Sequence, residues 1–226
     1  MLNTQVEANK SSLNALSVED FASQASNNNV FILDTRDPES FRTSFIPQSL
    51  NLGLGNNFAP WMTRIFPNKS TKIILVCEAG ALCQCEALLN ELGYHNILGY
   101  LEGGFQSWVN SNKEIDFIER LSIDQFAKAC HKNKKIVDVR HDVEYFSQHV
   151  INAENISLDN LIEEKQSFEN EPCILYCQGG YRSMIVASLL KREGFEEVKD
   201  VEGGFSEIIE HDIELTPYKC PTNFQK

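Results

Sequence analysis

The chain has 226 residues, 42% of them apolar, which suffices for two compact domains with a core in each. Its formal net charge of −12 argues against a nucleic-acid partner. No apolar run approaches the roughly 18 residues of a membrane helix, and residues 1–10 lack a secretory-signal pattern. Seven cysteines without disulfide-scaffold spacing indicate free thiols in a reducing cytoplasm. We therefore expect a cytoplasmic protein that binds neither nucleic acid nor membrane.

The first half alternates short apolar runs with amphipathic segments. Short apolar runs predict strands at residues 30–33, 72–76 and 97–100. Helices are predicted at residues 17–26, at 39–43, from 82 to a stop at Gly93, and around Trp108. Ser17 supports the first helix because it opens a capping-box pattern, and Gly93 is a typical C-terminal stop.

The second half repeats this order. Strands are predicted at residues 135–139, 173–176 and 198–200. Helices are predicted from Ser122, over residues 184–192 and from Phe205. Alternating short strands and helices indicate an α/β fold, in which a mostly parallel sheet has helices on both faces.

Two motifs occur twice and reveal a duplication. Asp-Thr-Arg at 34–36 recurs as Asp-Val-Arg at 138–140, an offset of 104. Glu-Gly-Gly-Phe at 102–105 recurs at 202–205, an offset of 100. A repeat this long is a duplicated domain and not a solenoid unit. The predicted domains span residues 12–114 and 118–212, followed by a tail at 213–226.

The most informative segment lies between the strand 173–176 and the following helix. It reads Cys177, Gln178, Gly179, Gly180, Tyr181, Arg182 and Ser183. A cysteine at the strand end lies above backbone N–H groups at a helix N-terminus, and these groups and the guanidinium favour its thiolate. The two glycines let the backbone curl with its N–H groups inward, and Arg182 offers donors to an anionic substrate. We predict that Cys177 is the nucleophile and that residues 178–183 bind substrate, with Gln178 and Tyr181 at the mouth.

The length of this loop distinguishes two chemistries. Six residues from Cys177 to Arg182 leave room for a persulfide or thiosulfonate sulfur, whereas one more residue would suit a phosphate or arsenate. The size therefore favours sulfur transfer over a phosphatase. The Cys177 thiolate would take sulfane sulfur from a donor, and a thiol, sulfite or cyanide acceptor would remove it in a ping-pong reaction. The alternative is a non-catalytic sulfur carrier or interaction module.

These motifs together resemble the tandem rhodaneses, sulfurtransferases with two homologous domains, over roughly residues 12–112 and 120–211. The resemblance implies that Cys177 is the nucleophile, that the loop cradles its persulfide, and that Asp138 and Arg140 are a structural pair. It also implies a donor such as thiosulfate, glutathione persulfide or a protein persulfide.

The first half resembles a narrower group of tandem rhodaneses. It contains the sequence Phe-Ala-Pro-Trp at 58–61 and resembles modules that accompany metallo-β-lactamase-type persulfide dioxygenases. The resemblance implies a separate dioxygenase partner. The five histidines show no His-x-His spacing, so we expect neither a metal site nor a cofactor.

The first copy of the cysteine loop departs from the second. Cys77 matches Cys177, but Leu82 replaces Arg182. Glu78 lies beside the thiol, and a neighbouring carboxylate raises a thiol pKa. We therefore expect Cys77 to be a poor nucleophile and the first domain to be inactive and structural.

Two further cysteines follow in the first loop. The alternative to an inactive domain is that Cys77 and Cys83 form a redox pair or relay persulfide sulfur. Cys83 and Cys85 also resemble half of a metal site, but no second pair completes it. Cys85 shares an apolar helix face with Leu82 and Leu89, so we expect it in the core.

Overall fold

The computed structural model describes residues 11–132, 134–163, 168 and 171–220. Residues 1–10, where the sequence shows no signal pattern, and 221–226, the end of the expected tail, lie outside the described residues. Internal contacts divide the chain into two compact units. Unit 1 comprises Met1–Arg36 and Leu54–Lys113, and unit 2 comprises Asp37–Gly53 and Glu114–Lys226.

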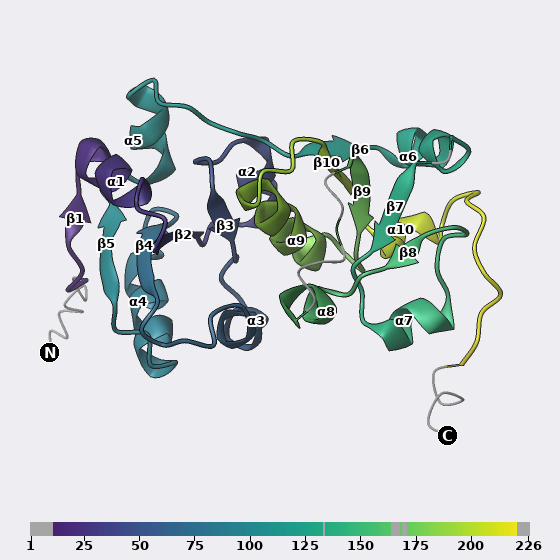
Figure 1. The fold of residues 1–226 in the computed structure, drawn as a ribbon, viewed down its shortest axis with the longest axis horizontal. Helices are drawn as coiled ribbons and strands as arrows, with labels where there is room; N and C mark the ends of the chain where they lie inside the picture. The colour runs from purple at the N-terminus through teal and green to yellow at the C-terminus, as the bar shows by residue number, and fades with distance from the viewer. Residues whose placement is uncertain (1–10, 133, 164–167, 169–170, 221–226) are drawn as a thin grey trace, which may run out of the picture. The chain divides into compact units, whose positions relative to one another are not determined.

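The first sheet has the strand order β1-β5-β4-β2-β3 (Figure 1). Its strands are β1 (Ala15–Leu16), β2 (Val30–Asp34), β3 (Ser49–Asn51), β4 (Lys72–Val76) and β5 (Ile97–Leu101). The pairs β1/β5, β4/β5 and β2/β4 are parallel, and their register sets Asp34 opposite Val76. The central strands are almost fully buried, as expected for a parallel sheet that is covered by other elements.

Five helices belong to the first repeat: α1 (Val18–Ala25), α2 (Pro38–Thr43), α3 (Phe58–Ile65), α4 (Leu82–Glu91) and α5 (Gly104–Asn110). Helix α1 begins where the sequence predicts, because the Ser17 hydroxyl accepts the Asp20 N–H at 3.1 Å. Phe21 on α1 meets Trp108 on α5 edge to face, with 6.1 Å between the ring centroids. Trp108 is therefore a core residue of unit 1.

The second sheet repeats the topology in the order β6-β10-β9-β7-β8. Its strands are β6 (Glu119–Leu121), β7 (Lys135–Asp138), β8 (Glu154–Asn155), β9 (Cys173–Tyr176) and β10 (Val198–Val201). Every neighbouring pair in this sheet is parallel. The two sheets thus confirm the predicted fold class, two tandem α/β domains with parallel sheets flanked by helices.

Among its described residues, the second repeat contains five helices: α6 (Ile123–Cys130), α7 (Asp142–Ser147), α8 (Leu158–Glu163), α9 (Tyr181–Arg192) and α10 (Phe205–Ile208). Ser122 and Gln125 form the predicted capping box of α6. Helix α9 begins three residues before the predicted start, at Tyr181, so that the cysteine loop is shorter than the sequence suggested. None of the helices within the described ranges is long and apolar enough to span a membrane.

The chain after α10 runs back along the second unit. Leu215 forms an isolated antiparallel bridge with Val150, and the Thr216 N–H donates to the His149 carbonyl oxygen at 2.9 Å. The Lys219 N–H donates to the carbonyl oxygen of Ser147 at 2.8 Å. The described part of the expected tail therefore lies against unit 2.

Candidate active site

Cys177 lies directly after the central strand β9 and before helix α9. Its side chain is only 2% exposed, and the Gly180 N–H donates to Sγ at 3.1 Å. Gly180 caps α9 with a φ of +96°, a left-handed conformation that favours glycine. Of the two loop glycines that the sequence singled out, only Gly180 adopts a positive φ. The loop thus turns one backbone donor onto the sulfur.

The second Glu-Gly-Gly-Phe motif supports this loop from behind. The Phe205 N–H donates to the Cys177 carbonyl oxygen at 2.7 Å, and the Ser206 N–H donates to that of Gln178 at 3.1 Å. Gly204 has a φ of +59°, and a Cβ placed there would lie 2.4 Å from the Cys177 carbonyl oxygen. Gly204 is therefore required for the close approach, a role that sequence reasoning had not assigned. The sequence feature that could have indicated this role is the recurrence of the Glu-Gly-Gly-Phe motif.

Arg182 reaches out of α9 to a carboxylate. Its Nη1 and Nη2 lie 2.5 Å and 2.9 Å from the two carboxylate oxygens of Glu144, so the pair is bidentate. The Arg182 side chain is 15% exposed and that of Glu144 is 30% exposed. Burial alone would raise the pKa of Glu144, but the hydrogen bonds and charge of Arg182 outweigh burial and lower it. Arg182 is thereby fixed in one orientation, with two of its donor groups engaged inside the protein.

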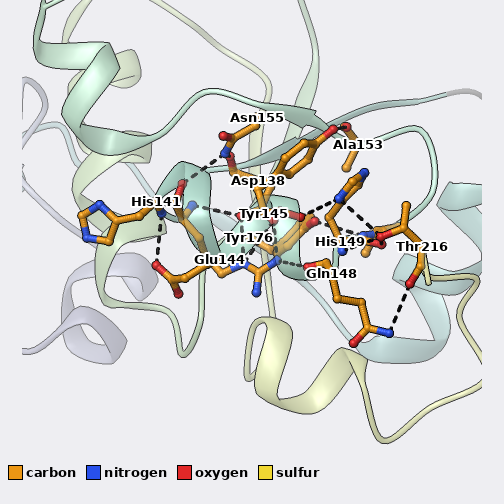
Figure 2. Close-up of polar contacts among 12 residues, drawn as sticks. Asp138, His141, Glu144, Tyr145, Gln148, His149, Ala153, Asn155, Tyr176 and Thr216 are labelled. Carbon is orange, nitrogen blue, oxygen red and sulfur yellow. Dashed lines mark hydrogen bonds and ion pairs between the residues drawn. The ribbon is translucent and has the colours of Figure 1, made fainter. Parts of the chain in front are cut away.

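Glu144 is itself held by the start of α7. Figure 2 shows its carboxylate beside the backbone of His141, whose N–H donates to Oε2 at 3.1 Å. The His141 ring in turn lies 2.6 Å from the Asp159 carboxylate. Sequence reasoning missed Glu144, although an acidic residue in the first turn of a helix is a common capping-box partner.

Ser183 points away from the mouth of the loop. Its hydroxyl donates to Asp200 Oδ1 at 2.7 Å, and both residues are fully buried. Burial raises the pKa of Asp200, and the charge of Arg120, whose Nη2 lies 2.7 Å from Oδ2, partly offsets that rise. Arg120 also pairs with Glu39. Ser183, predicted to bind substrate, is thus the inner anchor of the loop.

The remaining loop residues occupy different surroundings. Gln178 and Gly179 are exposed, and the Gln178 amide donates to the Ser206 hydroxyl at 2.9 Å. The Tyr181 hydroxyl donates to the Gly53 carbonyl oxygen at 2.8 Å, and burial raises the pKa of Tyr181. Of the predicted substrate-binding residues, Gln178 and Gly179 are therefore the most accessible.

The repeated Asp-x-Arg motif forms a buried ion pair in each unit. Arg140 Nη2 lies 2.7 Å from Asp138 Oδ2, and its guanidinium lies 3.6 Å from the ring centroid of Phe205. Asn155 bridges the carbonyl oxygens of Asp138 and Arg140 (Figure 2). In unit 1, Arg36 pairs with Asp34 and lies 4.0 Å from the ring centroid of Phe105. These contacts explain why both motifs recur together and support the structural role expected for Asp138 and Arg140.

A family model described as Rhodanese-like domain matches residues 17–111 and 122–211, well over half of the chain. The chain belongs to the rhodanese-like family. This confirms the resemblance inferred from the sequence motifs.

Several relatives match parts of this rhodanese-like chain. YqhL of Bacillus subtilis, an uncharacterized protein, is 32% identical over 89 residues, covering 39% of the chain and 70% of that protein. The thiosulfate sulfurtransferase GlpE of Coxiella burnetii is 38% identical over 71 residues, covering 31% and 66%. A tRNA uridine(34) hydroxylase of Protochlamydia amoebophila is 37% identical over 97 residues, covering 38% of the chain and 30% of that protein. The chain thus spans less than two thirds of the length of two of these three relatives.

Among solved structures, the chain is similar to a thiosulfate sulfurtransferase from Pseudomonas aeruginosa. The match covers 92% of the chain and 44% of that protein, with 18% identity and a TM-score of 0.42. No group of three or more His, Cys, Asp or Glu side chains in the described segments is arranged to hold a metal ion.

The first cysteine loop contains a thiol whose pKa is shifted. Cys77 is partly exposed, and Cys85, which the sequence assigned to the core, is fully buried. The hydrogen bond from Cys85 lowers the pKa of Cys77 and outweighs burial and the charges of Asp34 and Glu78. The charge of Glu78 raises the pKa of this thiol, as the sequence predicted, although the net shift is downward.

Proposed function

We propose that this rhodanese-like protein is a sulfurtransferase in which Cys177 carries a sulfane sulfur between a donor and a thiophilic acceptor. The observation that carries the proposal is the Gly180 N–H directed at Cys177 Sγ, at the end of β9. A donor N–H in this position hydrogen-bonds to the sulfur that would attack the donor and orients it. The loop is fixed behind by residues 204–206, so the sulfur stays aligned with its donor.

The reaction is a double displacement. The Cys177 thiolate attacks the outer sulfur of thiosulfate or a low-molecular-weight persulfide and releases sulfite or a thiolate. A thiol, sulfite or cyanide acceptor then removes the sulfane sulfur and regenerates the thiolate. No metal ion or cofactor takes part in either half-reaction.

The Glu144–Arg182 pair bears on how strongly the loop attracts a donor. A carboxylate that engages both terminal nitrogens of Arg182 offsets its positive charge at the loop. Thiosulfate and glutathione persulfide are both anionic, so the pair weakens the attraction of either donor and does not select between them.

Steady-state turnover tests the proposal. Sulfite or sulfide release is measured with thiosulfate and with glutathione persulfide, for the wild type and for Cys177→Ser. A sulfurtransferase shows ping-pong kinetics that are lost in the variant. The second candidate function is a non-catalytic sulfur carrier. Such a protein takes up one sulfur per chain but does not turn over with any acceptor. Its partner would be a persulfide-metabolising enzyme such as a dioxygenase.

A further inference from the structure

A small cavity opens in unit 2 at the end of strand β9 that lies away from the Cys177 loop. Its volume is about 220 Å³, and residues of α6, β9 and β10 line it. Cys173, the first residue of β9, belongs to the lining, whereas Cys177 follows the last residue of that strand. Because four residues of a strand span about 13 Å, the cavity is a site separate from the cysteine loop.

Part of the cavity wall is apolar and continuous with the core of unit 2. Leu121 and Ile174 are buried members of that core, and Ala129 packs against it. The cavity is smaller than the roughly 300–1,000 Å³ of sites for drug-sized ligands. Its occupant is therefore a small molecule with a short apolar part.

Four lysines line the rest of the cavity, in a chain whose formal net charge is −12. Lys128 lies in the last turn of α6, and Lys132 follows one turn later. Lys134 leads into β7, and Lys199 lies on β10. Lys199 pairs with Glu119 at 2.7 Å, whereas the other three have no ion-pair partner among the residues that the structure describes. We call this site the lysine cavity.

The usual reason for basic residues at the end of a helix explains only part of this group. Lys128 and Lys132 lie where a cation interacts favourably with the carbonyl end of α6. Lys134 and Lys199 are not on that helix, yet they line the same cavity. The convergence of lysines from a helix, a turn and a strand therefore needs another explanation.

The first repeat shows that the fold does not require these lysines. Helices α1 and α6 begin at residues 18 and 123, an offset of 105, so Lys128 corresponds to Ser23. At the same offset, Lys132 corresponds to Asn27. At the offset of 100, a glycine stands at the position of Lys199. The positive charge at this place is thus a property of the second unit alone.

The polar groups of the lysine cavity suit a phosphate better than a carboxylate. The described lining contains no arginine, whose fork matches a planar carboxylate, and lysine binds phosphate as a point charge. The Gln125 side-chain oxygen accepts the Ser122 N–H at 2.9 Å, which leaves the amide N–H groups of Gln125 for a ligand. The three unpaired lysines, less the Glu197 carboxylate in the lining, give a charge of +2. A phosphate monoester carries about −1.5 to −2 at neutral pH.

We propose that the lysine cavity binds a small phosphate monoester. Its phosphate group contacts Lys128, Lys132 and Lys134, and its short carbon part lies against the apolar wall. Binding is noncovalent and uses no residue of the cysteine loop. The site therefore does not depend on the function proposed for Cys177.

Calorimetric titration of the full chain tests this site. The probes are inorganic phosphate, ethyl phosphate and citrate, each at the same ionic strength so that screening is equal. One ethyl phosphate should bind per chain, several-fold more tightly than inorganic phosphate, because its ethyl group is covered by the apolar wall. Citrate, a carboxylate of higher charge, should bind more weakly than ethyl phosphate.

Matched variants identify the lysines. Lys128→Ser and Lys132→Asn introduce the residues of the first repeat, and together they should weaken ethyl phosphate binding at least about tenfold. Lys72→Asn removes an exposed lysine at the start of β4 and should leave the affinity unchanged within about twofold. All three side chains are exposed, so the variants should fold, and an unchanged Tm without ligand checks this.

Each outcome supports or overturns the proposal. One-to-one binding that weakens in the two variants at the lysine cavity, and not in Lys72→Asn, supports it. Citrate bound as tightly as ethyl phosphate overturns the assignment to phosphate. Affinity that falls in Arg182→Leu, and not in the variants at the cavity, places the ligand on the cysteine loop and overturns the proposal. Neither heat nor a rise in Tm at millimolar ethyl phosphate overturns it as well.

Discussion

The two cysteine loops share a scaffold but differ in what surrounds the sulfur. Each follows a buried strand of a parallel sheet, and each has a glycine of the Glu-Gly-Gly-Phe motif behind its cysteine carbonyl oxygen. The Cys177 sulfur accepts a backbone N–H and its loop contains Arg182, whereas the first loop has Leu82 at the matching position. The motifs that hold the loop are the same in both units, and the residues around the cysteine differ. The comparison teaches that a duplicated fold can keep its frame while the surroundings of its cysteine change.

The largest expected difference concerns the nucleophiles themselves. Cys177→Ser should lower the rate of sulfur transfer by about a thousandfold or more, because a serine hydroxyl does not form a persulfide. Cys77→Ser should leave that rate unchanged within about twofold. The measurement is turnover with a saturating donor and a thiol acceptor. A large loss of sulfur-transfer rate in Cys77→Ser would show that the two loops act in one reaction and would contradict the distinction drawn between them.

The arginine distinguishes the second loop from the first. Arg182→Leu copies the first loop and should lower kcat/KM by about ten- to a hundredfold, because the bidentate pair that orients the loop is lost. The matched variant, Leu82→Arg, should confer no sulfur transfer on Cys77. The check is kcat/KM with glutathione persulfide for both variants. Equal rates for Arg182→Leu and the wild type would contradict the account.

The glycines behind the loops should differ in their tolerance of a Cβ. Gly204→Ala places that atom 2.4 Å from the Cys177 carbonyl oxygen, and Gly104→Ala places it 3.2 Å from that of Cys77. Both positions have a positive φ, so both variants are strained. We expect losses of about 3 kcal/mol and about 1 kcal/mol in the free energy of unfolding, measured in urea. Gly179→Ala, with open space around it, is the control.

The smallest expected effect concerns the pH dependence of Cys77. A lowered pKa means that the thiolate is present at lower pH than for an ordinary cysteine, so alkylation should begin earlier as pH rises. Cys85→Ile removes the hydrogen bond and should shift the alkylation profile of Cys77 to higher pH, slowing the reaction several-fold at neutral pH. The measurement is the alkylation rate of the peptide fragment that contains Cys77, followed as a function of pH. An unchanged profile would mean that Cys85 does not influence Cys77.

The sequence predicted the long buried strands and capped helices well. Apolar runs such as 72–76 and the capping box at Ser122 are local signals, and the structure confirms both. Elements that depend on distant contacts were missed, among them α3, α7, α8 and the short edge strands β1, β3 and β8. Strands of two or three residues carry too little periodicity to be recognised without their neighbours.

The candidate site was predictable only where residues are adjacent in the chain. Cys177 and its loop follow from one segment, but the supports from Glu144 and Gly204 come from elsewhere in the sequence. Cys85 lies on the apolar face of a helix, so periodicity alone assigns it to the core. The influence of Cys85 on the pKa of Cys77 is a property of the folded unit, and the periodicity of the helix could not reveal it.

Peptide masses before and after incubation with glutathione persulfide test the central claim most directly. In the wild type, the peptide that contains Cys177 should gain about 32 Da, and added thiol should remove it. Cys177→Ser should show no gain on that peptide. A stable adduct there in the variant, or none in the wild type with either glutathione persulfide or thiosulfate, would contradict Cys177 as the sulfur carrier.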